Sequence, residues 1–235
     1  NFGTILGLGT NATITASVMG TISGEVGMIA VTDHVQGASI NNISINGGIV
    51  NSGLISALGG NASLDGSITQ SRDPGSSGAF LIAWAQSGNA LGLEMSGSSS
   101  IIGGITNQGV IEARSGNVSI NTVFDSGYSD VYVSTHAFSG NASGLNIQYS
   151  NVTGNINNSG QISAIAGSAS AITQDPVVYS AADYIVVGGD AIGLSMHVSS
   201  VSGSVINSGL IQGIGGSAIA SSSLATVQGG IGAGI

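Results

Sequence analysis

The chain has 235 residues, of which 42% are hydrophobic, 4% aromatic and only 6% charged, with 40 glycines and 2 prolines. This apolar content argues against an intrinsically disordered chain, and the shortage of charged residues argues against a helical bundle. Eleven acidic and two basic residues give a net charge of −9, which argues against binding to nucleic acid or to an anionic membrane surface.

The motif Asn-x-Gly-x-Ile occurs five times along the chain. It begins at Asn1, Asn51, Asn107, Asn158 and Asn207, so that successive motifs are 50, 56, 51 and 49 residues apart. A nearly fixed period of this size is typical of solenoids, propellers and other repeat arrays. The sequence therefore predicts one repeat array over 1–235, with units at about 1–36 (partial), 37–91, 92–143, 144–192 and 193–235 (partial).

Within each unit, apolar and polar residues alternate over three to five positions between Gly-containing turns, as in 152–165. This pattern predicts an all-β fold of short strands. About six such strands fit into one period, which suggests two coils per unit, each of roughly 20–27 residues. A single coil with a protruding arm is the other arrangement that fits the period.

A parallel β-solenoid accounts for the repeated columns, because equivalent residues of successive coils stack on one another. The predicted inward ladder consists of Ile55, Ile111, Ile162 and Ile211, and the predicted corner ladder of Asn51, Asn107, Asn158 and Asn207. We expect the corner residues to adopt positive φ angles, which Gly and Asn tolerate. A β-propeller is the alternative fold, although the strong aromatic or Trp-Asp signature of propeller blades is missing.

A second column recurs at 88–95, 140–147 and 189–196, and variable segments separate it from the preceding motif. Most of the aromatic residues lie in or beside these segments, including Phe80, Trp84, Tyr132 and Tyr184. One interpretation is an aromatic stack that closes the core locally. The other is a lateral contact surface, because tyrosine and tryptophan are enriched at interfaces.

Residues that could carry chemistry are scarce. Asp73, Asp125 and Asp175 recur in matching loops and are candidate Ca²⁺ ligands, although turn-capping is their ordinary role. The three histidines, His34, His136 and His197, fall at different phases of the repeat and do not suggest a zinc site. There is no cysteine, which excludes disulfides and thiolate metal sites. We therefore expect no enzyme activity and no resident cofactor.

The chain begins and ends inside repeats, and no signal peptide or uninterrupted apolar span of eighteen residues is visible. We interpret it as a mature fragment, or as part of a longer polypeptide, that does not insert into a membrane. The final residues, 229–235, are uncharged and apolar rather than a polar cap. Uncapped ends of a solenoid would favour head-to-tail or lateral association between copies.

The runs at 103–113 and 203–213 follow a Gly-x-Ile-x-Asn-x-Gly-x-Ile-x-Ala pattern. This pattern resembles the passenger repeats of Gram-negative surface proteins of the autotransporter and filamentous-haemagglutinin types. The resemblance implies an extracellular, right-handed β-solenoid without a common catalytic site. We expect a glycine-rich structural protein that self-assembles into a cell-surface fibre, sheath or coat. The alternative is an adhesin passenger region whose lateral loops bind a host or glycan ligand.

Overall fold

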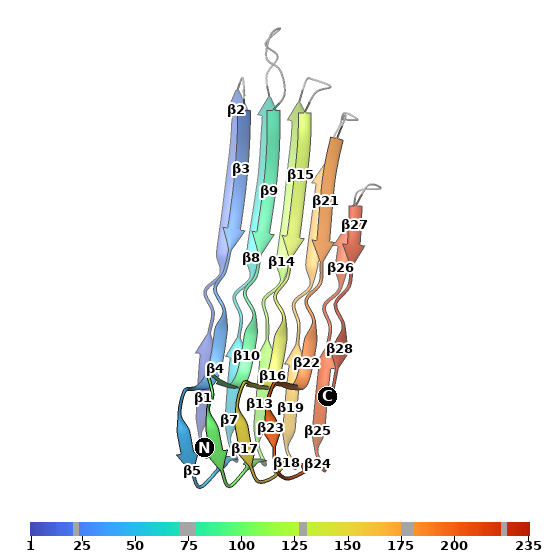
Figure 1. Ribbon diagram of the computed structural model, residues 1–235. Helices are drawn as coiled ribbons and strands as arrows, with labels where there is room; N and C mark the ends of the chain where they lie inside the picture. Colours follow the sequence, from blue (N-terminus) through green and yellow to red (C-terminus); the bar gives the residue numbers. More distant parts are fainter. Residues whose placement is uncertain (21–23, 71–78, 127–130, 175–180, 222–224) are drawn as a thin grey trace.

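The computed structural model describes residues 1–20, 24–70, 79–126, 131–174, 181–221 and 225–235. All regular secondary structure in these residues is β-strand, and the strands form six parallel sheets. The predicted all-β, parallel β-solenoid is therefore confirmed (Figure 1). The alternative of a β-propeller is wrong, because the strands pair from coil to coil and not within separate blades.

One turn of the solenoid takes one whole repeat. Thr4 of the first coil is the partner of Leu54, and Leu54 is in turn the partner of Val110, so that successive coils are offset by the repeat length. Each strand from β1 to β22 pairs with the strand six positions later along the described chain. The prediction of two coils per repeat was therefore wrong, and the alternative of one coil with an arm is correct. Alternation with a period of two identifies strands, but it does not say which strands pair.

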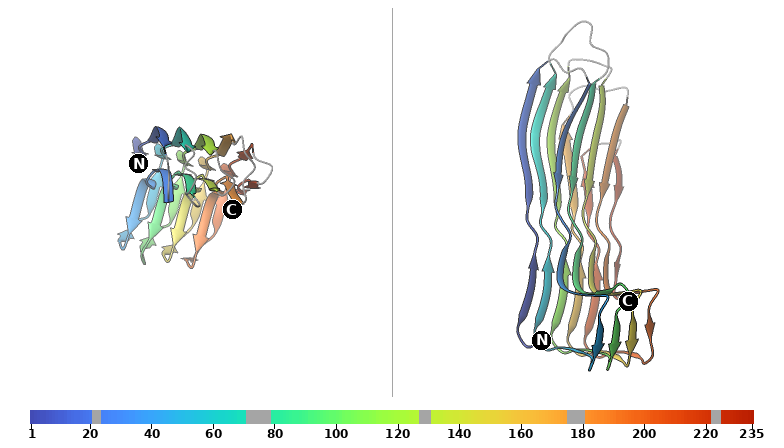
Figure 2. Two further views of the ribbon diagram at one scale, coloured as in Figure 1. Left: turned by 90° about the horizontal axis from the view of Figure 1, so that it is seen from above. Right: turned by 60° about the vertical axis from the view of Figure 1, so that its left-hand side comes forward.

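The first four coils contribute strands to a base, a foot and an arm, and the fifth contributes strands to the base and the arm; Figure 2 shows these parts from two further directions. Base sheet 1 consists of β1 (Thr4–Leu8), β7 (Leu54–Leu58), β13 (Val110–Arg114), β19 (Gln161–Ile165) and β25 (Leu210–Ile214). Base sheet 2 consists of β4 (Val35–Asn41), β10 (Ala90–Ser96), β16 (Ala142–Gln148), β22 (Ala191–His197) and β28 (Gly232–Ala233).

The foot projects to one side of the base and contains two four-stranded sheets (Figure 2). The first consists of β5 (Ser44–Asn46), β11 (Ser100–Ile102), β17 (Asn151–Thr153) and β23 (Ser200–Val201). The second consists of β6 (Ile49–Asn51), β12 (Ile105–Asn107), β18 (Ile156–Asn158) and β24 (Val205–Asn207).

The arm extends from the other end of the base and contains the longest strands (Figure 1). Arm sheet 1 consists of β2 (Ala12–Gly20), β8 (Ala62–Gln70), β14 (Val118–Ser126), β20 (Ala169–Gln174) and β26 (Ala218–Ala220). Arm sheet 2 consists of β3 (Gly24–Val31), β9 (Ala79–Gln86), β15 (Val131–Phe138), β21 (Ala181–Val187) and β27 (Ala225–Gln228).

The core has three parts. The base and foot enclose aliphatic side chains such as Ile101, Ile111 and Ile147. A neck between base and arm is lined by alanines and one valine, so the facing strands approach closely there. The arm core lies between the two arm sheets and includes Phe124. Apolar burial on both inner faces accounts for the stability of this layered arrangement.

Among the described non-glycine residues, positive φ angles occur at a corner other than the expected one. The non-glycine residues with positive φ are Asn42, Ser98, Tyr149 and Val198, at 55°, 66°, 49° and 45°. They follow base sheet 2, one in each of four coils, and lead into the foot. The asparagines of the repeated motif are not among the residues with positive φ, so our expectation for that corner was wrong. Their role is hydrogen bonding between coils.

Candidate functional site

The asparagines of the repeated motif form a hydrogen-bonded ladder along the solenoid axis. The Nδ2 of Asn1 donates to Oδ1 of Asn51 at 3.0 Å, and Asn51 donates to Asn107 at 2.8 Å. Asn107 donates to Asn158, and Asn158 to Asn207, each at 2.7 Å. The three middle asparagines are buried, whereas Asn207 lies exposed in the last coil. The ladder therefore connects all five coils through one column of side chains.

Each ladder amide also fixes the backbone around it. The Nδ2 of Asn51 donates to the carbonyl oxygen of Val110 in the next coil at 3.2 Å, and its Oδ1 accepts the N–H of Gly53 at 3.3 Å. Asn107 likewise donates to the carbonyl of Gln161 at 3.1 Å. Buried polar groups are costly unless they are paired. These contacts supply the pairing and hold each turn against the next.

The motif glycines are required by the close approach of successive turns. A Cβ atom on Gly109 would lie 2.1 Å from the carbonyl oxygen of Gly53, and one on Gly160 would lie 2.0 Å from that of Gly109. Neither glycine is among those with positive φ. Only glycine, which has no side chain, therefore allows the backbones of successive coils to stack at the Asn-x-Gly corner.

The motif isoleucines form the inward ladder of the base. Ile5, Ile55, Ile111, Ile162 and Ile211 are successive Cα partners in base sheet 1. Ile55, Ile111 and Ile162 are 3%, 0% and 0% exposed, whereas Ile5 in the first coil is 38% exposed. An additional coil would remove this remaining apolar surface from water, which is favourable.

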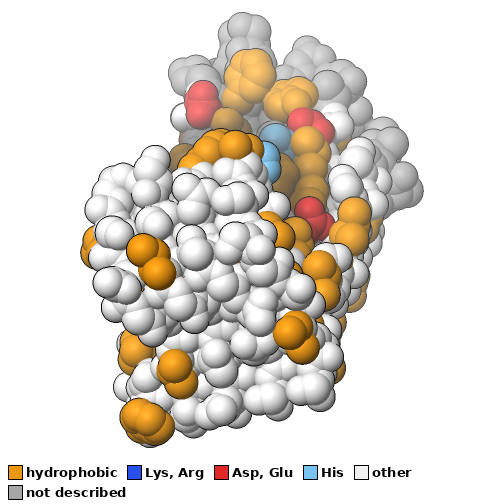
Figure 3. Space-filling model, turned by 60° about the horizontal axis from the view of Figure 1, so that its bottom comes forward, with side chains coloured by type: hydrophobic (Ala, Val, Ile, Leu, Met, Phe, Trp, Pro, Cys, Tyr) orange, Lys and Arg blue, Asp and Glu red, His pale blue; other side chains and the backbone are white. Residues whose placement is uncertain are grey.

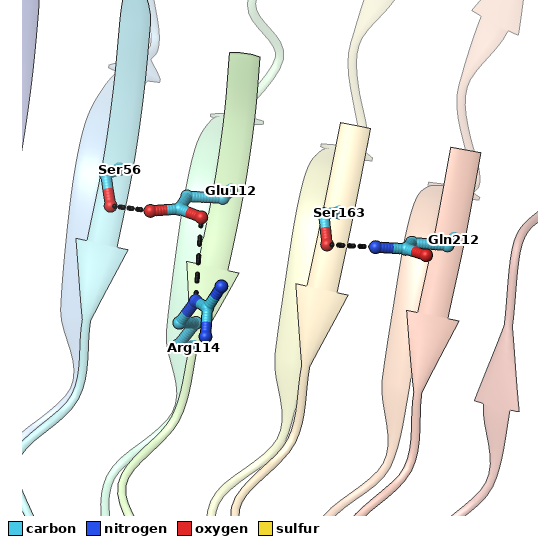
Figure 4. A network of polar contacts seen from close by, with 5 residues as sticks. All are labelled: Ser56, Glu112, Arg114, Ser163 and Gln212. Carbon is cyan, nitrogen blue, oxygen red and sulfur yellow. Dashed lines mark hydrogen bonds and ion pairs between the residues drawn. The ribbon is translucent and has the colours of Figure 1, made fainter. Parts of the chain in front are cut away.

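A polar column on the outward side of base sheet 1 was not among our predictions. The Oγ of Ser56 donates to Oε1 of Glu112 at 2.9 Å, and Arg114 Nε lies 3.5 Å from Oε2 of the same carboxylate (Figure 4). Further along the column, Nε2 of Gln212 donates to Ser163 Oγ at 3.0 Å (Figure 4). Alignment of the repeats would have placed these residues together. An ion pair this exposed adds about 0–1 kcal/mol to stability.

An aromatic cluster covers part of the outward side of arm sheet 2. The rings of Phe80 and Tyr132 are 5.6 Å apart, and Trp84 lies 5.2 Å from His136 and 5.3 Å from Phe138. These distances are typical of favourable aromatic pairs. We call these five residues the aromatic face. Phe80 is exposed and Trp84 is half-buried, so this face is accessible to a partner.

Tyr184 does not belong to the aromatic face, although the sequence suggested it as a lateral contact. It is 6% exposed and packs in the arm core. In register it is the partner of Thr135, which also faces inward, whereas the partner of Tyr132 is Ala181. Successive side chains of a strand point to opposite faces, so position within the strand excludes Tyr184 from the surface.

The three histidines lie at separate places on the coil. His136 Nε2 lies 3.0 Å from Asp183 Oδ2 and 3.2 Å from Ser134 Oγ. His34 Nδ1 accepts the N–H of Asn89 at 2.9 Å. The His197 ring is 5.6 Å from that of Tyr149. Each histidine thus has its own local contacts, and the three do not converge on one site.

Of the three candidate Ca²⁺ ligands, Asp125 alone lies in the described part of the chain. Asp73 and Asp175 lie outside the described residues. Asp125 is exposed on β14. Within the described part of the chain, no group of three or more histidine, aspartate or glutamate side chains could hold a metal ion. Across the same residues, no helix is long and apolar enough to cross a membrane.

Comparison with known proteins adds no relative: no family model, curated protein or solved structure matches this chain.

Proposed function

We propose that this protein is an extracellular structural repeat protein whose coils stack into a surface fibre, sheath or coat. The asparagine ladder is the observation that carries this proposal. Each ladder amide donates in the same direction along the axis, from one coil to the next. A stack built in this way can accept a further coil without rearranging those already present.

The two end coils of the stack offer complementary halves of the same contacts. In the first coil, Oδ1 of Asn1 accepts only the N–H of Gly3, at 3.0 Å, among the described residues. In the last coil, Nδ2 of Asn207 donates to the carbonyl of Gly209 at 3.1 Å and not to another asparagine of the described residues. An added coil, from the same polypeptide or from a second copy, would meet a free position in the ladder at either end.

Contact between unlike ends is head-to-tail, and head-to-tail contacts that do not close into a ring give open filaments. The unpaired edges of the terminal strands would add backbone hydrogen bonds to this contact. Ile5 would become buried in the same step, since its counterparts in the middle coils are fully enclosed.

The surface composition fits close lateral packing outside the cell. Charged residues are 6% of the chain, and lysine is absent. The end of the molecule that faces the viewer in Figure 3 is mostly uncharged and polar, with separate apolar side chains. The resemblance to surface repeat proteins supports an extracellular location, and antibody labelling of intact cells would test it.

Assembly can be tested with the 235-residue chain. We expect filaments in electron micrographs above a critical concentration, and an axial diffraction spacing of about 4.7–4.8 Å from the parallel strands. Ile5→Lys places a charge at the end contact and should raise the critical concentration about tenfold or more, which is ~1.4 kcal/mol. Ile172→Lys is the matched control, because Ile172 is 44% exposed in an arm strand of an inner coil.

A chain that stays monomeric at all concentrations would contradict self-assembly by this protein. Equal effects of the two lysine substitutions would contradict assembly through the coil ends and would point to lateral contacts instead. Native material from the cell surface provides the independent check, since fibres or tubes with a regular axial repeat are expected there.

The aromatic face supports a second candidate function, an adhesin passenger region. Exposed Phe80 and half-buried Trp84 form a surface of the kind that is enriched at binding interfaces. The segments that the sequence suggested as ligand-presenting loops, from Gly60 to Gly88 and their counterparts, include residues 71–78, 127–130 and 175–180, which lie outside the described residues. Short separate rods with a distinct tip in native material, and host-cell binding that Trp84→Ala abolishes, would favour this function.

A further inference from the structure

A hollow of about 230 Å³ lies on the outward side of base sheet 2, over β10, β16 and β22. Leu91, Ser143 and Ile192 occupy one row across these three strands, as Cα partners. The central serine is much smaller than the aliphatic residues on its two sides. The hollow therefore exists because one coil lacks the side-chain volume that its neighbours provide.

Two polar side chains of β16 lie in the hollow and are largely shielded from solvent. Ser143 is 9% exposed and Asn146 is 3% exposed, and both line the hollow. The Oγ of Ser143 is the one buried side-chain polar atom of the described residues that has no hydrogen-bond partner. No hydrogen bond of the Asn146 amide to another described residue is present either, and its polar atoms retain access to the hollow.

Unpaired buried polar groups are unusual in folded proteins, because each loses its hydrogen bonds to water without replacement. The neighbouring coil shows the ordinary arrangement. Glu94, the partner of Asn146 in β10, pairs with Gln36 Nε2. The Ser143 hydroxyl therefore lacks a partner among the described residues, and the hollow gives a partner room beside this hydroxyl and the Asn146 amide.

The upper rim is held in place by a second ladder. The Oδ1 of Asn89 accepts the N–H of Asn141 at 2.9 Å, and Oδ1 of Asn141 accepts the N–H of Asp190 at 2.8 Å. These bonds fix both amides through their oxygen atoms. Neither Nδ2 group donates to another described residue, so two further donors line a preorganised rim.

We propose that this hollow binds one neutral, hydroxyl-rich ring, such as a single sugar residue. Serine and asparagine offer both donors and acceptors for ligand hydroxyls, and Leu91 and Ile192 offer apolar sides for the carbon–hydrogen face of the ring. Among the described residues, none that is basic lines the hollow and Asp190 supplies its only carboxylate, so an anionic ligand is disfavoured. Its volume is below the ~300–1,000 Å³ of pockets for drug-sized molecules.

The proposal does not depend on self-assembly, because the hollow opens on the lateral surface of an inner coil. It is tested with the whole chain at a concentration where it stays monomeric, by nuclear magnetic resonance of the side-chain amides. The probes are glucose, galactose and N-acetylglucosamine, with glucuronate as the anionic comparison. We expect dissociation constants in about the millimolar range for at least one neutral sugar, and weaker binding of glucuronate.

Ser143→Leu restores the bulky row and fills the hollow, so it should fold with a Tm at or above that of the parent chain. It should weaken binding of the neutral sugar about tenfold or more, with loss of the shifts at Asn141 and Asn146. Ser119→Leu, on the outward side of β14, is the matched control and should bind as the parent does. Absence of shifts with every neutral sugar would mean that the hollow holds water only, and would overturn the proposal. Shifts that persist in Ser143→Leu would also overturn it.

Discussion

The base and the arm are parts of the same coil, but their cores repeat to different degrees. In base sheet 1, an isoleucine occupies the equivalent inward position in every coil. In arm sheet 2, one inward column contains Met28, Ala83, Thr135, Tyr184 and Ala225. Base sheet 1 therefore gains stability from stacking identical side chains, whereas arm sheet 2 must match a different set in every coil.

In the arm, the inward side chains of one sheet complement those of the facing sheet in size and polarity. Met28 packs over Gly66, where an added Cβ would lie 3.0 Å from the methionine sulfur. The Oγ1 of Thr173 donates a hydrogen bond to Oγ1 of Thr135 at 3.3 Å. Dense interiors require such complementarity in size and polarity. A repeated motif thus specifies one part of this solenoid, while coil-specific packing specifies another.

The largest expected effect comes from placing a charge in the base ladder. Ile162→Asp buries a carboxylate with no opposite charge, at a cost of about 5 kcal/mol or more in the free energy of unfolding. Ile172→Asp, at an exposed arm position, should change it by less than about 0.5 kcal/mol. Chemical denaturation measures both variants. Unchanged stability of Ile162→Asp would mean that Ile162 does not face the core.

A cavity in the arm should have a smaller and more local effect. Phe124 is fully buried, and Phe124→Ala should cost about 3–5 kcal/mol. We expect amide hydrogen exchange to rise in β8, β14 and β20 while β13 and β19 stay protected, because Phe124 packs in the arm core and not in the base. Val123→Ala, which truncates a neighbouring exposed side chain, is the control. Equal loss of protection in the base would show that base and arm unfold as one unit.

The smallest effect on stability is expected in the asparagine ladder, where the loss of a buried inner asparagine is compared with the loss of the exposed last one. Asn107→Ala removes bonds to the coils on both sides and should cost about 2 kcal/mol. Asn207→Ala removes one bond between coils at an exposed position and should cost less than about 1 kcal/mol. Thermal unfolding of both variants tests the difference. Similar costs would mean that burial adds little to the strength of the ladder.

Much of the base could be predicted from the sequence, because stacking makes equivalent residues identical. The fifty-residue period and the columns of asparagine and isoleucine are visible in the chain itself. The reason for the motif glycine was not visible. It is the approach of the Gly53 carbonyl to Gly109, a distance between coils that only the folded backbone defines.

The arm and the hollow illustrate what a single sequence leaves open. Tyr184 follows an aromatic pattern in the chain, but its place in the strand turns it into the core. Ser143 is one of many serines and is distinguished only by the larger Leu91 and Ile192 beside it. Both features depend on the pairing register, and the register is set by contacts between residues about fifty positions apart.

The strand content, the period and the residues of the two ladders follow from the chain alone, because local alternation and repetition are properties of the sequence. That one repeat makes one coil, with a base, a foot and an arm, follows only from the folded molecule. That choice depends on which strands pair and which faces they bury, and the free energy of those contacts arises only when distant segments meet.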